Sequence, residues 1–483
     1  MAKLRTRLVT GALFVVAGLA FAPAALAGGP SLVIGATEDV AKQSDPALSQ
    51  QEIVRAKAAG FTAIRITQAW LPGQTEPPGG DLTALKNAVF AATANQMQVF
   101  LVVSHPGSRT TPLTEQQRKD FATFVGALAK ALPAVRYYTI GNEPNLNGFW
   151  LPQFGPNGEN VAAPAYLELL AGAYDSLKAV STKIVVLGGA LSPRGSDNPA
   201  LARHTHSPTR FILDMGAAYK ASGRTKPVMD ALSINPFPDN SSQSPATPHQ
   251  STSIGVADYD KLVKLLGQAF DGTAQPGSTL PIYYGEFGVE SLPTAAKASL
   301  YTGEEPTTTK PVPEKTQAAY YRKAVELAFC QPNVAGIFMF LVVDDARRPG
   351  WQSGFYYADK TAKTSLAAMK QAIRQSRGGI VAKCAGFKLT PTIDRFGPFG
   401  SNGRYGVNFR CNVDCTADIQ LVRDSDKKVV GKLTGRALAG VYSIVRLPKL
   451  KLTPGTYKFN VAFYAPVNRG ATVLKSTRLF SVR

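Results

Sequence analysis

The sequence predicts an α/β protein, a (β/α)8 TIM barrel, followed by a small all-β, immunoglobulin-like sandwich. Within 28–380, apolar runs alternate with amphipathic runs, and this alternation is typical of parallel strands joined by helices. Within 384–483 the runs are short and separated by turn residues, as in an antiparallel sandwich. The apolar fraction of 45% is sufficient for two full cores. We therefore predict a large barrel domain over 28–380 and a sandwich domain over 384–483.

The segment 1–27 has the features of a secretory signal peptide. Basic residues near the start precede an apolar stretch over 8–22, and Ala-Leu-Ala at 25–27 forms a small-residue cleavage site. A membrane anchor is the alternative, but the apolar stretch is short for a span and no charged stop-transfer segment follows it. We expect a secreted, extracellular or cell-wall-associated protein with no membrane span after signal cleavage.

Eight apolar runs in the first domain are candidates for the barrel strands. They lack strict period-two alternation, as expected of strands that are buried on both faces. A doubly wound open sheet is the competing fold, but no glycine-rich phosphate loop follows the first run. The predicted strands are 31–36, 61–67, 97–104, 135–141, 183–189, 229–235, 280–286 and 334–343. The predicted helices are 49–60, 82–95, 115–132, 165–180, 207–222, 259–270, 316–330 and 362–377.

The second domain is predicted to contain short strands and to be tied by disulfides. Four cysteines in an exported chain suggest two bridges. Cys411 and Cys415 are placed to staple a local turn, and Cys330 and Cys384 to tie the two domains together, although four cysteines allow three pairings. A zinc site is disfavoured because the spacings do not fit and no histidine is near. The predicted strands are 405–410, 417–423, 442–447, 457–464 and 473–480.

The chain is strongly basic, with a formal charge of +20. Residues 384–483 contribute 17 Lys and Arg against 5 Asp and Glu, so the second domain carries much of the excess. Such a field favours a polyanionic partner, which for an exported protein means an anionic cell-wall polymer; a merely solubilising charge is the alternative. No motif for nucleic acid, phosphate or a cofactor is present. His204 and His206 lack a nearby third metal ligand, so we expect a solvated loop and no metal.

Two glutamates stand at the ends of β-prone runs in the first domain. Glu143 precedes Pro144, which cannot donate to a sheet ladder, and Glu286 lies between Gly285 and Gly288, which allow the backbone to bend. A parallel barrel keeps its active site at the C-terminal ends of its strands. Two carboxylates from distant strands are the groups that cleavage of a glycosidic bond requires. The sequence therefore predicts a hydrolase or transferase of sugars.

Around these two glutamates the chain resembles the clan A retaining glycoside hydrolases, in particular their cellulase-like and xylosidase-like members. The resemblance covers roughly 31–377 and rests mainly on Asn142-Glu143-Pro144. It implies hydrolysis of a β-linked oligo- or polysaccharide by double displacement, without a cofactor. In that mechanism Glu143 would be the general acid/base and Glu286 the nucleophile.

The resemblance also implies further site residues. Asn142 matches the asparagine that holds the sugar 2-hydroxyl, and Arg65 matches the arginine that orients the nucleophile. His105 falls where many members place a polar subsite group. On the sixth strand this chain has Asn235 and Phe237 where many relatives have His and Tyr. Asn235 can still donate to a hydroxyl, whereas Phe237 has no hydroxyl to place near the nucleophile.

Three tryptophans follow predicted strands two, four and eight. These residues are Trp70, Trp150 and Trp351, and a common place on one rim predicts sugar-stacking platforms. Burial as core filler is the alternative for each of them. Two other functions also remain open at this point. One is a non-catalytic cell-wall carbohydrate-binding protein on a hydrolase-like barrel, and the other is a transglycosidase that uses the same residues.

Overall fold

The computed structural model describes residues 28–379, 389–399, 404–411, 415–437, 442–465 and 468–482. Residues 28–379 form a closed barrel of eight parallel strands in sequential order, as the sequence predicts. The predicted signal segment 1–27 lies outside the described residues. The barrel strands are β1 Val33–Thr37, β2 Ala63–Ala69, β3 Gln98–Ser104, β4 Tyr137–Ile140, β5 Val185–Leu191, β6 Ala231–Ile234, β7 Ile282–Phe287 and β8 Val334–Phe340.

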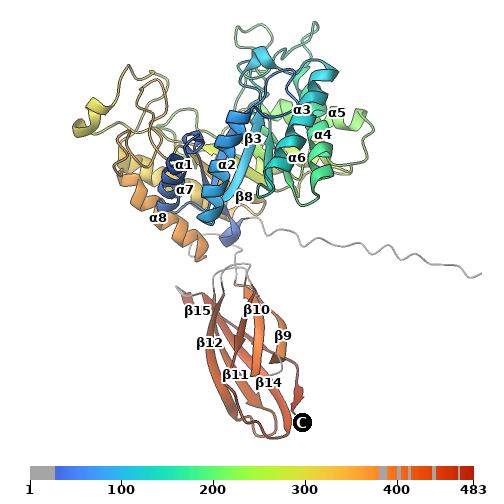
Figure 1. Cartoon of the computed structure of the whole chain (residues 1–483), viewed down its shortest axis with the longest axis vertical. Helices are drawn as coiled ribbons and strands as arrows, with labels where there is room; N and C mark the ends of the chain where they lie inside the picture. The colour runs from blue at the N-terminus through green and yellow to red at the C-terminus, as the bar shows by residue number, and fades with distance from the viewer. Residues whose placement is uncertain are drawn as a thin grey trace, which may run out of the picture.

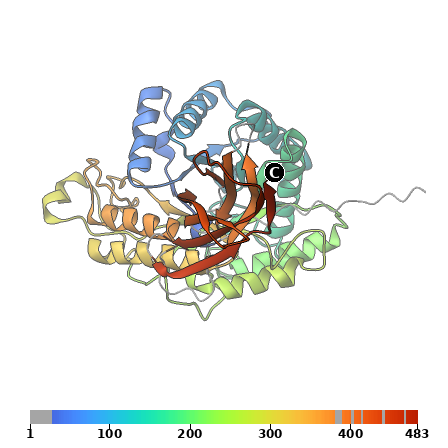
Figure 2. The ribbon, with the colours of Figure 1, turned by 90° about the horizontal axis from the view of Figure 1, so that it is seen from below.

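Eight α-helices alternate with the strands and follow one another around them (Figures 1 and 2). They are α1 Pro46–Ala58, α2 Gly79–Ala94, α3 Glu115–Ala131, α4 Ala162–Val180, α5 Pro208–Ala221, α6 Tyr259–Phe270, α7 Glu314–Cys330 and α8 Thr364–Arg377. Short 3-10 helices occupy Gly29–Ser31, Asp39–Ala41, Ser108–Thr110, Val256–Asp258 and Ala295–Leu300. Within the described residues, no helix combines the length and apolarity that a membrane crossing requires.

Side chains that point into the barrel form layers. These layers fill the interior below the C-terminal ends of the strands, which are called the upper end of the barrel. The lowest layer is an apolar cluster that includes Ala63, Phe100 and Phe338, with the rings of Phe100 and Phe338 4.7 Å apart. Side chains in a strand alternate between its two faces. Two residues after Ala63, Arg65 therefore also points inward, and Thr67 reaches the open end. The period of the strand thus fixes the height of each functional group above the packed floor.

The C-terminal region forms two antiparallel sheets, in the orders β13-β10-β9 and β12-β11-β14-β15, with β16 paired to β14. One hydrophobic core takes side chains from both sheets, for example Phe409 and Phe463, whose rings lie 5.3 Å apart. The all-β prediction is confirmed, and the immunoglobulin-like arrangement stays a prediction. The strands are β9 Pro391–Phe399, β10 Arg404–Cys411, β11 Cys415–Arg423, β12 Val429–Ala437, β13 Ser443–Arg446, β14 Gly455–Ala465, β15 Asn468–Ser476 and β16 Phe480–Val482.

The strand predictions for this region were incomplete. Two strands, β9 and β12, were missed, because glycine, proline and charged residues within them obscure the alternation that marks a strand. The predicted run 473–480 in fact joins the end of β15 to the start of β16. The short polar break between them carries too weak a turn signal to be recognised in the sequence.

One of the two predicted disulfides is present in full. Cys411 and Cys415 are bonded to each other, across the end of β10 and the start of β11. Cys330, at the end of α7, is also disulfide-bonded. Its predicted partner Cys384 lies outside the described residues, so that pairing stays a prediction, as do the exact domain boundaries at 380 and 384.

Candidate active site

A cleft of about 750 Å³ opens at the C-terminal ends of the barrel strands. Its lining comes from the C-terminal ends of the barrel strands and from the segments that follow them. Five of the nine predicted site residues line it: Asn142, Glu143, His105, Glu286 and Trp351. The two glutamates, 143 positions apart in the chain, therefore share one solvent-accessible space.

The backbone turns sharply at the end of β4 to present Glu143. Gly141 has φ +80°, and a Cβ there would lie 2.9 Å from the ring of Tyr166, so glycine suits this position. Glu143 itself has φ +45°, in the left-handed region that non-glycine residues seldom occupy. The Glu143 amide donates to the carbonyl of Ala190 at 2.9 Å, which fixes this conformation. Strain of this kind is characteristic of functional residues.

An irregularity in β7 turns Glu286 into the barrel. Tyr283 belongs to the inner cluster, so strict alternation would place Gly285 inside and Glu286 outside. The pairing of β7 with β8 shifts register between Tyr284 and Phe287. Such a bulge re-aims side chains next to active sites. Here it lets Glu286 line the cleft while Phe287 packs outward.

Gly285 leaves room for side chains from the end of β6 beneath Glu286. A Cβ at this position would lie 2.7 Å from Ser233 Oγ and 2.9 Å from Asn235 Oδ1. Both contacts are too close for any other residue without movement of the neighbours. The close approach of these side chains therefore favours glycine here, in addition to the bend that the sequence indicated.

Arg65 forms the direct ionic contact of Glu286. Its guanidinium nitrogen Nη1 lies 2.6 Å from Glu286 Oε1, and the Arg65 side chain is only 2% exposed. A charge-assisted hydrogen bond of this length is among the stronger contacts in proteins. The predicted proximity of Arg65 to Glu286 is thus present. Within the described residues, the buried Arg65 Nε and Nη2 have no hydrogen-bond partner.

The surroundings of the two carboxyl groups favour different protonation states. Burial raises the pKa of Glu143 to about 7, and the negative charge of Glu286 adds to the shift. Burial also raises the pKa of Glu286, but the adjacent Arg65 guanidinium acts in the opposite direction. The ion pair thus favours an ionised Glu286, and the repulsion between the two groups favours a protonated Glu143.

Asn235 contacts Glu143 and does not line the cleft. It is fully buried, and its Nδ2 donates to Glu143 Oε1 at 3.2 Å. The expectation that Asn235 donates to a sugar hydroxyl is therefore replaced by a contact that positions Glu143. Asn235 does not reach the cleft because it lies one layer above Ser233 but still below the rim of the barrel.

His105 and Asn142 lie in the cleft as the resemblance implies. His105 Nδ1 lies 2.9 Å from the carbonyl of Gly107, so this nitrogen carries the hydrogen and Nε2 is left as an acceptor. Burial lowers the pKa of His105, which favours this neutral form. The buried Oδ1 of Asn142 has no partner among the described residues. Both side chains thus retain polar capacity for a hydroxyl-rich ligand.

The three tryptophans do not share one environment. Trp351 lines the cleft, is 37% exposed, and packs against Phe237 and Phe340 at centroid distances of 5.0 and 5.1 Å. Trp70 is fully buried, and its ring packs against Phe121 of α3. The stacking prediction is therefore wrong for Trp70, which follows β2 in sequence but turns outward into the layer beneath the helices.

Trp150 is likewise outside the cleft lining. It is 1% exposed, and its ring lies 5.6 Å from His105 and 5.9 Å from Tyr166. The stacking prediction therefore does not hold for Trp150, which instead supports His105 from behind. Residue type and position after a strand could not separate these cases, because the direction of a loop side chain depends on the packing of the whole loop.

A buried ion pair holds the segment that carries Trp351. Lys363 Nζ lies 3.0 Å from each carboxylate oxygen of Asp344 and donates to the carbonyl of Gln352 at 3.1 Å. Both charged side chains are 1% exposed. Tyr301 and the Gly354 amide donate to the same carboxylate at 2.7 and 2.8 Å. The pair therefore ties the segment after β8 to the start of α8.

We expect Lys363→Met to lower the free energy of unfolding by about 3–5 kcal/mol, because it leaves the Asp344 carboxylate buried without its cation. Urea unfolding would measure the loss. Lys297→Met is the control, since its ion pair with Asp359 is partly exposed and should contribute far less to stability. Equal losses in the two variants would contradict this account of the buried pair.

Two other carboxyl groups near the rim, those of Glu38 and Glu290, have structural partners and lie outside the cleft lining. Glu38 accepts the amides of Val342 and Val343, and Glu290 accepts the amide of Gln352. Burial raises the pKa of Glu38 and of Glu290 to about 7. A raised pKa therefore does not by itself distinguish a catalytic carboxyl group here. The position of the group in the cleft is the additional criterion.

Sequence reasoning missed the two arginines of the cleft lining, Arg194 and Arg203, which lie between β5 and α5. Arg194 follows the end of β5 by three residues, so the rule that strand ends face the site would have found it. His206 also departs from its prediction. It is buried rather than solvated, and its Nε2 lies 2.9 Å from the carbonyl of Gln153.

The fold and site together define a TIM-barrel protein with a carboxylate pair at the C-terminal ends of β4 and β7. No protein-family model matches the chain, and no curated protein sequence matches it either. Solved structures with related folds include the GH5_18 protein of Streptomyces cattleya in complex with GlcNAc, with 15% identity and a TM-score of 0.49. This match covers 72% of the present chain and 81% of the other.

Two further structural neighbours have similar scores. The exo-β-1,4-mannosidase Op5Man5 from Opitutaceae bacterium strain TAV5 has 13% identity and a TM-score of 0.47, over 72% of this chain and 60% of that one. A calcium-binding mutant of β-glucuronidase 2 from Bacteroides uniformis has 12% identity and a TM-score of 0.44, over 93% of this chain. The present chain covers only 45% of that glucuronidase.

Proposed function

We propose that the protein is a retaining glycoside hydrolase that cleaves a β-linked oligo- or polysaccharide by double displacement. The observation that carries the proposal is the pair Glu143 and Glu286, which line one cleft from the ends of β4 and β7. Their surroundings favour one protonated and one ionised carboxyl group. Such a division of protonation states is what acid and nucleophile roles require.

In the first step Glu143 donates its proton to the glycosidic oxygen while Glu286 attacks the anomeric carbon. The leaving group departs, and a glycosyl ester forms on Glu286. Arg65 keeps Glu286 ionised before attack, and Asn235 holds Glu143 at its Oε1. Trp351 offers a flat apolar surface to a sugar ring.

In the second step Glu143 takes a proton from water, and the water attacks the glycosyl ester. The change of role follows from electrostatics. Once Glu286 is esterified it carries no charge, so the repulsion that helped raise the pKa of Glu143 disappears. Glu143 then ionises more readily and acts as a base.

The stereochemistry of the first product tests this proposal. A panel of aryl β-glycosides and β-linked polysaccharides identifies a substrate, and proton NMR at early times then follows the anomeric signal. We expect the β-anomer to form first and to mutarotate later. An initial α-anomer would indicate inversion and would exclude the double displacement. Products longer than the substrate would favour a transglycosidase, and binding without any turnover would favour a wall-binding protein.

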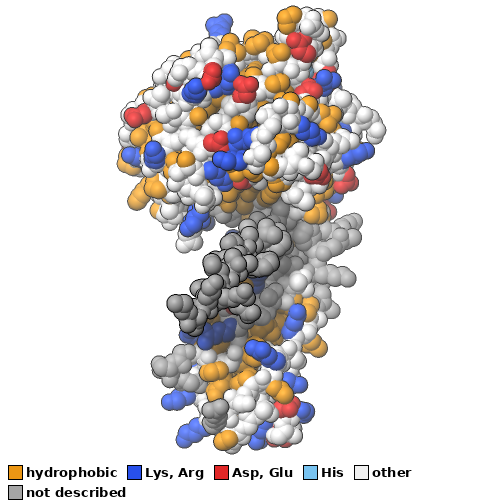
Figure 3. Space-filling view, turned by 90° about the vertical axis from the view of Figure 1, so that its right-hand side faces the viewer, with side chains coloured by type: hydrophobic (Ala, Val, Ile, Leu, Met, Phe, Trp, Pro, Cys, Tyr) orange, Lys and Arg blue, Asp and Glu red, His pale blue; other side chains and the backbone are white. Residues whose placement is uncertain are grey.

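The location and the second domain complete the proposal. We infer that the protein acts outside the cytoplasm, on the basis of the segment 1–27. The face of the C-terminal sheets in Figure 3 carries many Lys and Arg side chains and few acidic ones. An anionic cell-wall polymer is the partner that this charge would suit.

A further inference from the structure

The side of the cleft formed between β5 and α5 carries two arginines. Arg194 and Arg203 both line the cleft together with Glu143. The Arg194 side chain is 44% exposed, and Arg203 is exposed as well, so a ligand can reach both from solvent. Neither arginine takes a part in the proposed chemistry at the anomeric carbon. Two exposed cations in a sugar-sized cleft require a different account.

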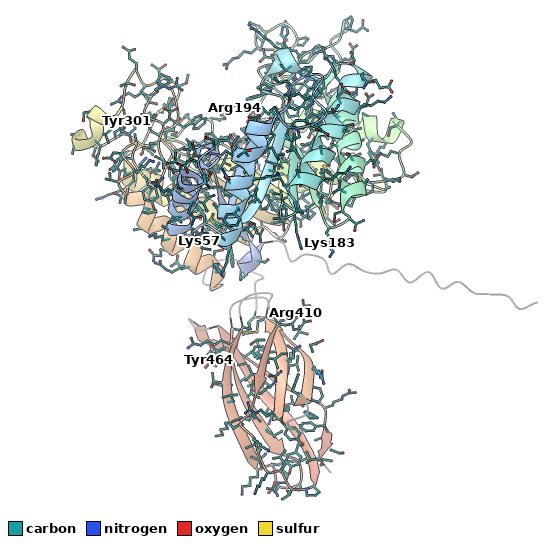
Figure 4. The ribbon with its side chains drawn as sticks, viewed as in Figure 1. Lys57, Lys183, Arg194, Tyr301, Arg410 and Tyr464 are labelled. Carbon is teal, nitrogen blue, oxygen red and sulfur yellow. A yellow bond between two sulfur atoms is a disulfide. The ribbon has the colours of Figure 1, made fainter. Side chains whose placement is uncertain are left out.

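Arg194 is held at the rim with part of its guanidinium free. Its Nη1 donates to the carbonyl of Pro238 at 3.1 Å and lies 3.0 Å from Asp239 Oδ1. The contacts of Arg194 within the described residues use this one nitrogen, so Nη2 and Nε keep their donors. Figure 4 shows Arg194 at the upper end of the barrel and Lys183 at the lower end. A guanidinium anchored in this way is suited to carboxylate or sulfate.

Different charged side chains act on the two glutamates of the cleft. The positive charge of Arg194 acts on Glu143 and opposes the rise of its pKa. On the other carboxyl group, the nearby charges are those of Arg65 and Asp39, and the Asp39 charge raises the pKa of Glu286. Asp39 lines the cleft as well. A cationic side thus adjoins the proposed acid, whereas the proposed nucleophile has charges of both signs near it.

The position of the two arginines indicates which part of a substrate they would meet. The general acid must touch the glycosidic oxygen, so the leaving group lies on the side of Glu143. We propose that the cleft selects substrates whose leaving-group portion carries a carboxylate or a sulfate, which Arg194 and Arg203 bind. This inference rests on the proposed function, because Glu143 defines the leaving-group side.

The test compares a 4-carboxyphenyl β-glycoside with its neutral methyl ester, using the sugar that the panel identifies. We expect Arg194→Gln to lower the ratio of kcat/KM for the acid to that for the ester by about 10-fold or more, as for a lost charge-assisted hydrogen bond. Arg203→Gln should lower the same ratio. Because the ratio is compared between variants, the intrinsic difference between the two leaving phenols cancels. A 4-(sulfooxy)phenyl glycoside, which carries a sulfate ester, is the third substrate and distinguishes sulfate from carboxylate recognition.

Lys183→Gln is the matched control, since it removes one exposed charge at the opposite end of the barrel and should leave the ratio unchanged. An unchanged ratio in both arginine variants, or an equal loss on acid and ester, would overturn the proposal. Titration calorimetry with the two uncleaved ligands and the Glu286→Gln protein supplies a second readout. If no glycoside is turned over, the proposed function fails, but the binding preference and its loss in Glu286→Gln/Arg194→Gln still decide whether this side of the cleft recognises anions.

Discussion

Replacing Glu286 by Gln should reduce turnover of every glycoside by on the order of 10⁴-fold or more, because no glycosyl ester can form without the carboxylate. Glutamine keeps the shape of the side chain, which limits the disturbance to the buried Arg65 next to it. Initial rates on an aryl β-glycoside measure the loss. Circular dichroism and the melting temperature show whether the variant is folded.

Glu290→Gln is the control that this chain offers for Glu286. Glu290 is the same residue type four positions later, it is buried, and burial raises its pKa to about 7. Its carboxylate accepts the Gln352 amide and does not line the cleft. We expect activity near that of the wild type. A folded Glu286→Gln protein that retains wild-type turnover would refute the assignment of the nucleophile.

Replacing Glu143 by Ala should have an effect that depends on the leaving group. For a poor leaving group, loss of the general acid should lower kcat/KM by about 10²–10⁴-fold. 2,4-Dinitrophenolate is a leaving group that departs without protonation. With a 2,4-dinitrophenyl glycoside, formation of the glycosyl-enzyme should therefore persist, and this intermediate should accumulate. Azide should then restore turnover and give a β-glycosyl azide, since it attacks without base assistance. Equal losses on both substrates, with no effect of azide, would exclude Glu143 as the acid/base.

The same residue should set the alkaline limb of the pH profile. The acid must be protonated, so wild-type kcat/KM on a poor leaving group should fall as the pH rises through the pKa of Glu143, about 7. In Glu143→Ala this limb should disappear, because the titrating group is gone. Burial raises the pKa of Glu290 to about 7 as well, so Glu290→Gln serves as the control and should keep the limb. A limb that survives in Glu143→Ala would assign it to another group.

Several features of the protein follow from the sequence because they depend on local pattern. Runs of apolar residues that alternate with amphipathic ones require strands covered by helices, and this gave the eight-stranded barrel. A proline directly after Glu143 and glycines around Glu286 indicate where strands end. In a parallel barrel those ends meet on one rim, so the shared cleft of the two glutamates was predictable without any knowledge of side-chain packing.

Other features were decided only when distant segments packed together. Trp70 and Trp351 both follow strands, yet one fills the core beside Phe121 and the other lines the cleft. Burial of a large ring depends on the space that other helices leave, and no local pattern encodes that space. Asn235 was expected to face a sugar, but its position directly after β6 brings it to Glu143 instead.

The inward position of Glu286 shows most clearly what the sequence determines and what only the tertiary structure decides. The sequence determined that a carboxylate would stand at the end of the seventh strand, because the apolar run stops there. Strict alternation from Tyr283 would have turned that carboxylate away from the barrel interior. The register shift against β8, together with the absence of a side chain at Gly285, brings it to Arg65 at 2.6 Å. Pairing between strands is a long-range property, so only the tertiary structure could decide which way the carboxylate points.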